Sequence, residues 1–294
     1  MPSRDRSRWR NVHFYNASND LLGGFYQAGS ITDANLIWIL RSVLLVQAEN
    51  LTIKHRASDR IITPSNNSVV PGDYVISCDG TIRVTDEPWF ARVISFSESG
   101  REDSFRTEVR QRDGRCVISG DINLLEPWDI WDGLQAAHVF PLEKENLWTQ
   151  YNFGRWITNM DHTTGVSKIN SVQNGLLMGA TLHGCFYQYM FSINPDIVTF
   201  APDSYRINGK VLDPICRNPN DLNHVADELL RWHFRQSVLA NMRGAGEPIF
   251  ESDFPPGTDQ IATLRDEPYG KERLGMEFEL RLGPRAKEEE ESTY

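Results

Sequence analysis

The sequence predicts an α+β fold. The chain has 294 residues, of which 40% are hydrophobic and 11% aromatic, so it can bury a sizeable core. Apolar side chains recur at the helical period in two well-separated segments, residues 31–48 and 221–242. Short strand-like runs bounded by turn signals occupy much of the remaining chain. Helices and short strands therefore both contribute to the predicted fold.

The first 100 residues are predicted to form a mixed strand and helix region. The helix expected over residues 31–48 has Ser30 or Thr32 in a position to cap it. Short apolar runs predict strands at 51–53, 60–63, 69–76 (two strands about Pro71-Gly72), 81–85 and 89–96. Asp79-Gly80 predicts a hairpin turn between two of these strands. The polar stretch 97–103 is the expected boundary.

Residues 101–205 are predicted to form a second region. A short helix is expected over 105–115, followed by a strand at 116–120 and a second strand at 134–141. Residues 143–168 read as an insert rich in Trp, Asn and Gly. Residues 171–189 are expected to pass from a turn into a helix.

Residues 206–294 are predicted to be a helical C-terminal region. The helix over 221–242 has acidic residues near its start and Arg243 near its end, as the helix dipole favours. Leu229, Trp232 and Leu239 are expected to pack this region on the core. A further helix is expected within 259–281, and the acidic tail from Pro284 onward is expected to fray.

The charge argues against a protein that holds nucleic acid mainly by bulk attraction. Lys and Arg number 30 and Asp and Glu number 40, which gives a net charge of −10. Residues 101–200 are themselves acidic, with eight Lys and Arg against twelve Asp and Glu, a net charge of −4. Phosphate binding depends on Lys and Arg, so nucleic acid is a disfavoured partner, although it is not excluded.

Neither secretion nor membrane insertion is predicted. The first ten residues are polar and basic, and no apolar region follows them. The longest apolar stretch, within residues 31–48, is interrupted by Asp33 and Arg41. The four cysteines form no CxxC pair, which is typical of free thiols in a reducing compartment. We therefore expect a cytoplasmic or nuclear protein with no membrane partner, and the oligomeric state stays open.

A His, an Asn and a second His occur in order within the acidic segment. His138 lies in an apolar run, Asn174 begins an Asn-Gly turn, and His183 follows nine residues later in the predicted helix. This order resembles the HNH nucleases, and most closely a fungal subfamily of HNH-domain proteins. The resemblance rests on the ordered blocks Cys116–Gly120, Ala136–Leu142, Trp148–Trp156, Ile169–Met178, Leu182–Tyr187 and Phe191–Asp196, and it continues downstream to Pro248.

The resemblance implies a ββα-metal (HNH) core, in which two strands and a helix surround one divalent ion, Mg²⁺ or Mn²⁺. His138, at the end of the second strand, would be the general base that takes a proton from the attacking water. Asn174 would pin the loop that carries this base. His183 would bind the metal, which stabilises charge on the scissile phosphate.

The chain departs from the family pattern at two positions. Ala137 occupies the place where HNH enzymes often have Asp or His as a second ligand, although the subfamily itself usually has Ala there, so this departure alone is not disabling. Tyr187 stands four residues after His183, where the subfamily has Asp. Residues at i and i+4 share a helix face, and a neutral phenol is a poor ligand for Mg²⁺ or Mn²⁺. The metal site is therefore expected to be degraded, unless it is completed by Asp161, His162 or Asp196.

Three functions remain open on the sequence. The first is a metal-dependent HNH endonuclease that uses His138 and His183. The second is an HNH scaffold that binds no cofactor and acts on a small-molecule substrate, as a cyclase or isomerase would, with His138 and Tyr187 as acid and base. The third is a binding module that keeps the fold without catalysis. In a repurposed site, the pocket walls are expected to be aromatic: Trp128, Trp131, Trp148, Tyr151, Phe153 and Trp156.

Overall fold

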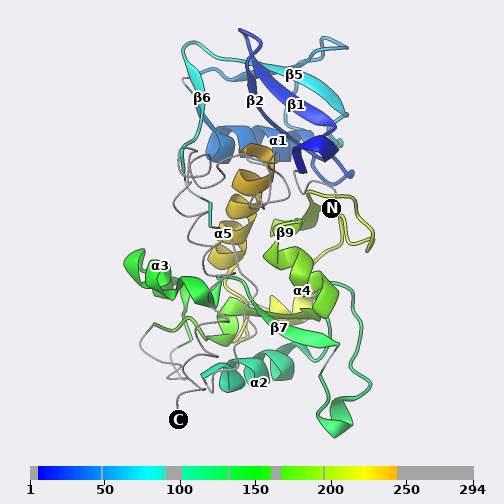
Figure 1. Ribbon diagram of the computed structural model, residues 1–294, viewed down its shortest axis with the longest axis vertical. Coiled ribbons are helices and arrows are strands. Elements are labelled where there is room, and N and C mark those ends of the chain that lie inside the picture. The colour runs from blue at the N-terminus through cyan, green and yellow to red at the C-terminus, as the bar shows by residue number, and fades with distance from the viewer. Residues whose placement is uncertain are drawn as a thin grey trace, which may run out of the picture.

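The computed structural model describes residues 6–47, 49–87, 89–90, 101–131, 133–159, 167–194 and 196–243 (Figure 1). It contains both helices and small sheets, so the predicted α+β class is confirmed. Three predicted segments lie outside the described residues: the helix expected within 259–281, the tail, and most of the strand expected at 89–96. No helix in the described ranges combines the length and apolar character that a membrane crossing requires.

The N-terminal region is built on a four-stranded sheet. Its strands are β1 (Val12–Asn16), β2 (Leu21–Phe25), β4 (Thr52–His55) and β5 (Gly72–Ser77), in the order β2-β1-β5-β4. Strands β1 and β5 run parallel, and the other neighbours run antiparallel. A separate pair joins β3 (Leu45–Gln47) to β6 (Ile82–Val84). The sheet and helix α1 (Asp33–Ile39) share one hydrophobic core.

Several predictions for this region need correction. The expected helix 31–48 ends at Ile39, passes through a π-helical turn (Leu40–Leu44) and becomes strand β3, because the β-branched and leucine-rich run after Ser42 pairs with β6. The strand expected at 60–63 is reduced to one bridge, between Ile61 and Lys54. The hairpin expected at Asp79-Gly80 is wrong, since β5 pairs with β1 and β4 whereas β6 pairs with β3.

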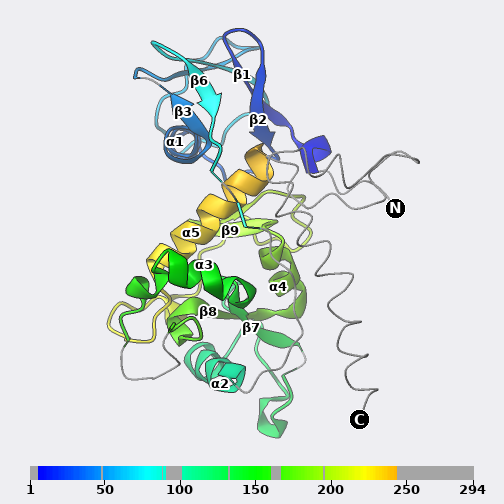
Figure 2. The ribbon, with the colours of Figure 1, turned by 60° about the vertical axis from the view of Figure 1, so that its left-hand side comes forward.

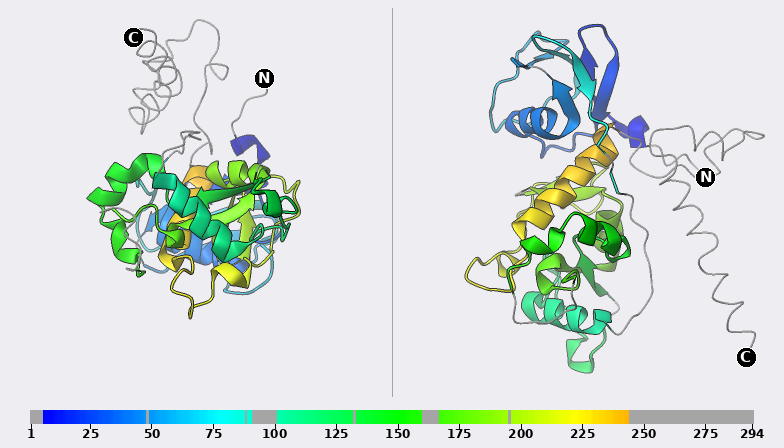
Figure 3. Two further views of the ribbon diagram at one scale, coloured as in Figure 1. Left: turned by 90° about the horizontal axis from the view of Figure 1, so that it is seen from below. Right: turned by 90° about the vertical axis from the view of Figure 1, so that its left-hand side faces the viewer.

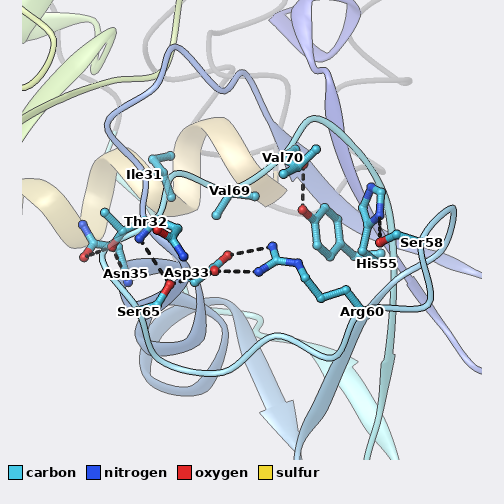
Figure 4. Close-up of polar contacts among 12 residues, drawn as sticks. Ile31, Thr32, Asp33, Asn35, His55, Ser58, Arg60, Ser65, Val69 and Val70 are labelled. Carbon is cyan, nitrogen blue, oxygen red and sulfur yellow. Dashed lines mark hydrogen bonds and ion pairs between the residues drawn. The ribbon is translucent and has the colours of Figure 1, made fainter.

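An ion pair between buried Asp33 and exposed Arg60 holds the connection between β4 and β5 over helix α1 (Figure 4). Asp33 is fully buried, and its carboxylate accepts hydrogen bonds from Arg60 at 3.0 and 3.3 Å and from the Ser65 hydroxyl at 3.0 Å. The Tyr74 hydroxyl donates to the Val70 carbonyl at 2.6 Å, and burial raises the pKa of this phenol. The contacts explain how a long connection without strands of its own is kept in place.

The second region is a layered arrangement of two strands between helices. Strand β7 (Leu134–His138) pairs antiparallel with β8 (Gly175–Gly179). Helix α2 (Arg101–Asp113) lies on one side of this pair and helix α4 (Ala180–Tyr187) on the other (Figures 1 and 2). Helix α3 (Glu145–Gln150) and the antiparallel pair of β9 (Phe191–Asn194) and β10 (Asp196–Thr199) complete it.

Two strand predictions in this region are changed by the structure. Residues Cys116–Gly120 form a turn rather than a strand, with the Gly120 amide bonded to the Cys116 carbonyl at 2.8 Å. The strand expected over 134–141 is present but ends at His138, and its partner β8 lies where a turn and helix were expected. His138 therefore ends the first strand of the pair rather than the second.

Helix α5 (Asp227–Val238) connects the two hydrophobic cores (Figure 3). Leu229 and Trp232 lie in the core of the second region, whereas Leu239, in the π-helical turn that follows, lies in the N-terminal core. The helix begins at Asp227 instead of the predicted Asp221, because the preceding residues are held in turns such as the bond from the His224 amide to the Asp221 carbonyl.

Candidate functional site

His138 lies at the end of β7 and faces helix α2. Its side chain is buried, and Nε2 lies 3.0 Å from Oδ1 of Asn170. The imidazole stacks on the ring of Phe105, with 3.8 Å between centroids and 10° between planes. An amide oxygen only accepts hydrogen bonds, so Nε2 of His138 is the donor in this pair.

Asn174 clamps the segment that follows His138. Its side chain is fully buried; Oδ1 accepts from the Phe140 amide at 2.8 Å, and Nδ2 donates to the carbonyls of Phe140 at 3.1 Å and Ile169 at 2.9 Å. The Val139 amide also donates to the Asn174 carbonyl at 2.8 Å. Three of these four hydrogen bonds thus hold the chain where it leaves β7, and the fourth ties Asn174 to Ile169 in its own segment.

His183 and Tyr187 lie together on helix α4. Nδ1 of His183 is 2.7 Å from Oε1 of Gln135 on β7, and the Tyr187 ring lies edge-on to the imidazole, with centroids 5.1 Å apart. The Tyr187 hydroxyl donates to Oε2 of Glu143 at 3.2 Å. We call these four residues, Gln135, Glu143, His183 and Tyr187, the α4 cluster.

The two histidines are on opposite faces of the β7–β8 pair. Successive side chains of a strand point to opposite faces, so Gln135 and His138, three residues apart, diverge. Gln135 meets His183 of α4, whereas His138 meets Phe105 of α2, and these helices lie on the two sides of β7 (Figures 1 and 2). The structure brings His183 together with Tyr187 but does not bring either of them together with His138.

The described residues of the α4 cluster do not fit a divalent metal ion. Ala137 supplies no donor atom, and the Tyr187 hydroxyl is directed to Glu143. The Nδ1–Gln135 contact of His183 fixes the orientation of the ring and supplies no second ligand. In the part of the chain that the structure describes, no three His, Cys, Asp or Glu side chains gather as a metal site would require. Asp161, His162 and the side chain of Asp196 lie outside the described residues.

A buried ion pair locks α2 against β8. Arg112 bonds to both oxygens of Asp113, at 2.6 and 2.9 Å, and donates to the carbonyls of Val172 and Gly175 at 2.8 and 2.7 Å. Asp113 in turn accepts from the Leu177 amide at 2.8 Å. Burial raises the pKa of Asp113, and the Arg112 guanidinium opposes that shift. These bonds hold the helix that carries Phe105 against the strands beneath His138.

Four side chains that complete these contacts were missed in the sequence: Phe105, Gln135, Glu143 and Asn170. Phe105 and Glu143 are not part of the His-Asn-His motif, so the motif does not point to them. Asn170 is 32 residues from His138 in the sequence, so their contact depends on the fold. Strand alternation could have identified Gln135, because it lies two residues before Ala137 and so faces the same side of β7.

Comparison with family models agrees with the layered geometry. Residues 116–194 match the family described as HNH endonuclease. Residues 9–83 match a second family, described as a domain of unknown function (DUF8573). The comparison with curated proteins and that with solved structures each returned no match. The β7–β8 pair, helix α4 and the ordered residues His138, Asn174 and His183 all lie within the first match. Residues 116–194 therefore form an HNH domain in a chain of α+β fold.

Proposed function

We propose that this HNH domain serves as a binding module and that its ancestral metal centre no longer supports phosphodiester hydrolysis. The observation that carries the proposal is the placement of His138 and His183 on opposite faces of the β7–β8 pair. A general base and a metal ion must act on the same scissile phosphate, the base through the attacking water and the metal through the phosphate and leaving-group oxygens. Two histidines separated by a strand pair do not meet that condition.

The chemistry of the remaining ligand positions supports the same proposal. Ala137 has no donor, and Tyr187 offers a phenol that already binds the Glu143 carboxylate. Mg²⁺ and Mn²⁺ prefer several oxygen ligands that include carboxylates. The net charge of −4 over residues 101–200 adds to this, because it disfavours the approach of a polyanionic substrate.

Plasmid nicking in the presence of Mg²⁺ and of Mn²⁺ tests the proposal. We expect no nicking by the wild-type protein and no stoichiometric binding of Mn²⁺ by electron paramagnetic resonance. The variant Tyr187→Asp restores the carboxylate four residues after His183 and is expected to gain Mn²⁺ binding. Wild-type nicking that disappears in His183→Ala, a change at a partly exposed position, would overturn the proposal.

A second candidate is a metal-dependent phosphodiesterase in which Glu143 replaces the missing carboxylate. One observation favours it: Oε2 of Glu143 lies 3.2 Å from the hydroxyl of Tyr187. Tyr187 is the residue that stands where the subfamily has Asp, so the Glu143 carboxylate lies close to the place of the missing one. In that case the wild type binds Mn²⁺, and Glu143→Gln abolishes both binding and nicking. Glu126→Gln, a change at an exposed residue outside the α4 cluster, is the matched control and should have no effect.

The small-molecule acid/base alternative has less support. His138 and Tyr187 are both nearly buried, and their contacts lie on opposite faces of the strand pair. One small substrate cannot touch both groups at the same time in that arrangement. Turnover of a small molecule that requires His138 and Tyr187 together would restore this alternative.

A further inference from the structure

A loop between α2 and β7 exposes an unusual number of large apolar side chains. It spans residues 121–131, contains the short helical turn Glu126–Trp128 and projects beyond β7 at the bottom of Figure 1. Leu124 is 73% exposed, Trp128 69% and Ile122 64%, and Leu125 and Ile130 are exposed as well. We call these five residues the apolar loop patch. Contiguous exposed apolar side chains of this kind mark sites of interaction.

The loop is held in one shape by its own hydrogen bonds. Asn123 accepts from the Leu125 amide at 3.0 Å and donates to the Ile130 carbonyl at 2.8 Å, which closes the loop across its width. Asp129 adopts a left-handed conformation and accepts from the Trp131 indole at 2.9 Å. The Arg110 guanidinium of α2 lies 4.6 Å from the centre of the Trp131 ring and anchors the loop base. The apolar side chains are thus presented outward by a defined backbone, which lowers the entropy cost of binding.

The loop itself is acidic. Asp121, Glu126 and Asp129 belong to it, and the sequence from Cys116 to Glu143 contains no Lys or Arg. Two arginines before it lie against the loop, but the Arg110 guanidinium covers the Trp131 ring at its base and Arg115 is paired with Asp213. Like charges would oppose the pairing of two copies of this loop, and carboxylates would repel both nucleic acid and an anionic membrane. A complementary surface must combine apolar side chains with positive charge.

We propose that the apolar loop patch is the docking surface for another protein, through a segment that presents apolar side chains beside Lys or Arg. Trp128 and Leu124, the two most exposed members, would insert between apolar side chains of the partner, and Glu126 would face its cations. This inference goes beyond the proposed function and does not depend on whether the HNH domain cuts phosphodiesters.

A designed peptide pair tests the proposal with the full-length protein. The probe is an amphipathic helical peptide made of Leu and Lys, and its counterpart carries Glu in place of each Lys. Calorimetric titration should show binding of the Lys peptide alone. Trp128→Ser/Leu124→Ser should weaken that binding roughly tenfold or more, as truncation of central apolar anchors does. The matched control is Val211→Ser/Leu222→Ser, which removes two equally exposed apolar residues elsewhere and should bind as the wild type does.

A charge variant separates docking from general attraction to an acidic protein. Glu126→Lys alters no buried contact and should also weaken binding of the Lys peptide. It therefore keeps the proposal testable if the double serine variant misfolds. Equal binding by wild type, loop variant and control would overturn the proposal. Concentration-dependent dimerisation of the wild type that Trp128→Ser abolishes would overturn it in favour of a second copy. Binding to phosphatidylcholine vesicles that Trp128→Ser abolishes would overturn it in favour of a membrane.

Discussion

The imidazole of His138 stacks on the ring of Phe105, with their planes 10° apart and their centroids separated by 3.8 Å. Phe105 belongs to α2, on the face of the β7–β8 pair opposite to α4 and His183. Both rings are buried, and the remaining edge of the imidazole bonds to Asn170. His138 therefore has the contacts of a packed core residue, at the position where the resemblance to HNH nucleases implies a general base.

His138→Ala is expected to destabilise the fold. The substitution removes a buried ring and leaves both Phe105 and Asn170 without their partner, so we expect a loss of about 2–4 kcal/mol in the free energy of unfolding. His183→Ala is the control; it removes a partly exposed ring and should cost under about 1 kcal/mol. Urea unfolding followed by tryptophan fluorescence measures both. Similar small losses in the two variants would contradict the structural role of His138.

Asn174→Ala should be at least as costly. The change leaves the buried amide and carbonyl of Phe140 and the carbonyl of Ile169 without the bonds that Asn174 supplies, at about 1–3 kcal/mol for each unsatisfied group. Asn218→Ala, which removes one exposed turn bond, is the control and should be nearly neutral. Thermal unfolding monitored by circular dichroism compares the two variants. Equal melting temperatures would show that the Asn174 clamp is dispensable.

The sequence predicts those elements whose side-chain pattern has a clear period. Helix α2 was expected at 105–115 and α5 at 221–242, and both are present with shifted ends. Strand β8 was missed because all but its last residue are buried, so its Leu-Leu-Met run shows no alternation of apolar and polar side chains. Strand β2 was hidden by Gly23 and Gly24, which weaken any strand pattern.

The candidate site was predictable in its residue types but not in its geometry. Ordered blocks identify His138, Asn174 and His183, since their order can be read along the chain. The face that each side chain occupies depends on where β7 starts and which strand it pairs with. The sequence predicts Cys116–Gly120 as the strand partner of β7, but the partner in the structure is β8. His138 therefore contacts Phe105 of α2 and does not line an open site.

An exposed ion pair gives the fold a defined dependence on acid. Nε of Arg115 lies 2.7 Å from the Asp213 carboxylate, and this bond holds the pKa of Asp213 below its ordinary value of 3.8. A carboxyl with a depressed pKa in the folded state stabilises the fold above its unfolded pKa, and this contribution is lost as the pH falls through the folded value. Carbon-13 NMR titration should show the Asp213 pKa rising toward 3.8 in Arg115→Gln. An unchanged titration would mean that Arg115 does not set this pKa.

Two glycines of the HNH domain should respond oppositely to alanine. At Gly175 an added Cβ would lie 2.5 Å from Cγ2 of Val109 and 2.6 Å from Cε2 of Phe105, although the backbone is ordinary extended chain with φ of −129°. Crowding alone should therefore cost about 1–3 kcal/mol in Gly175→Ala. It should also displace Phe105 from His138, which the imidazole proton shifts would report. At Gly184, inside helix α4, an added Cβ meets nothing within 4 Å, so Gly184→Ala should stabilise the fold by about 0.5–1 kcal/mol. Val109→Ala in the Gly175→Ala background removes the nearest clash and should recover part of the loss. If Gly175→Ala leaves the free energy of unfolding unchanged instead, α2 does not pack tightly on β8. Tight packing of α2 over His138 would then be contradicted.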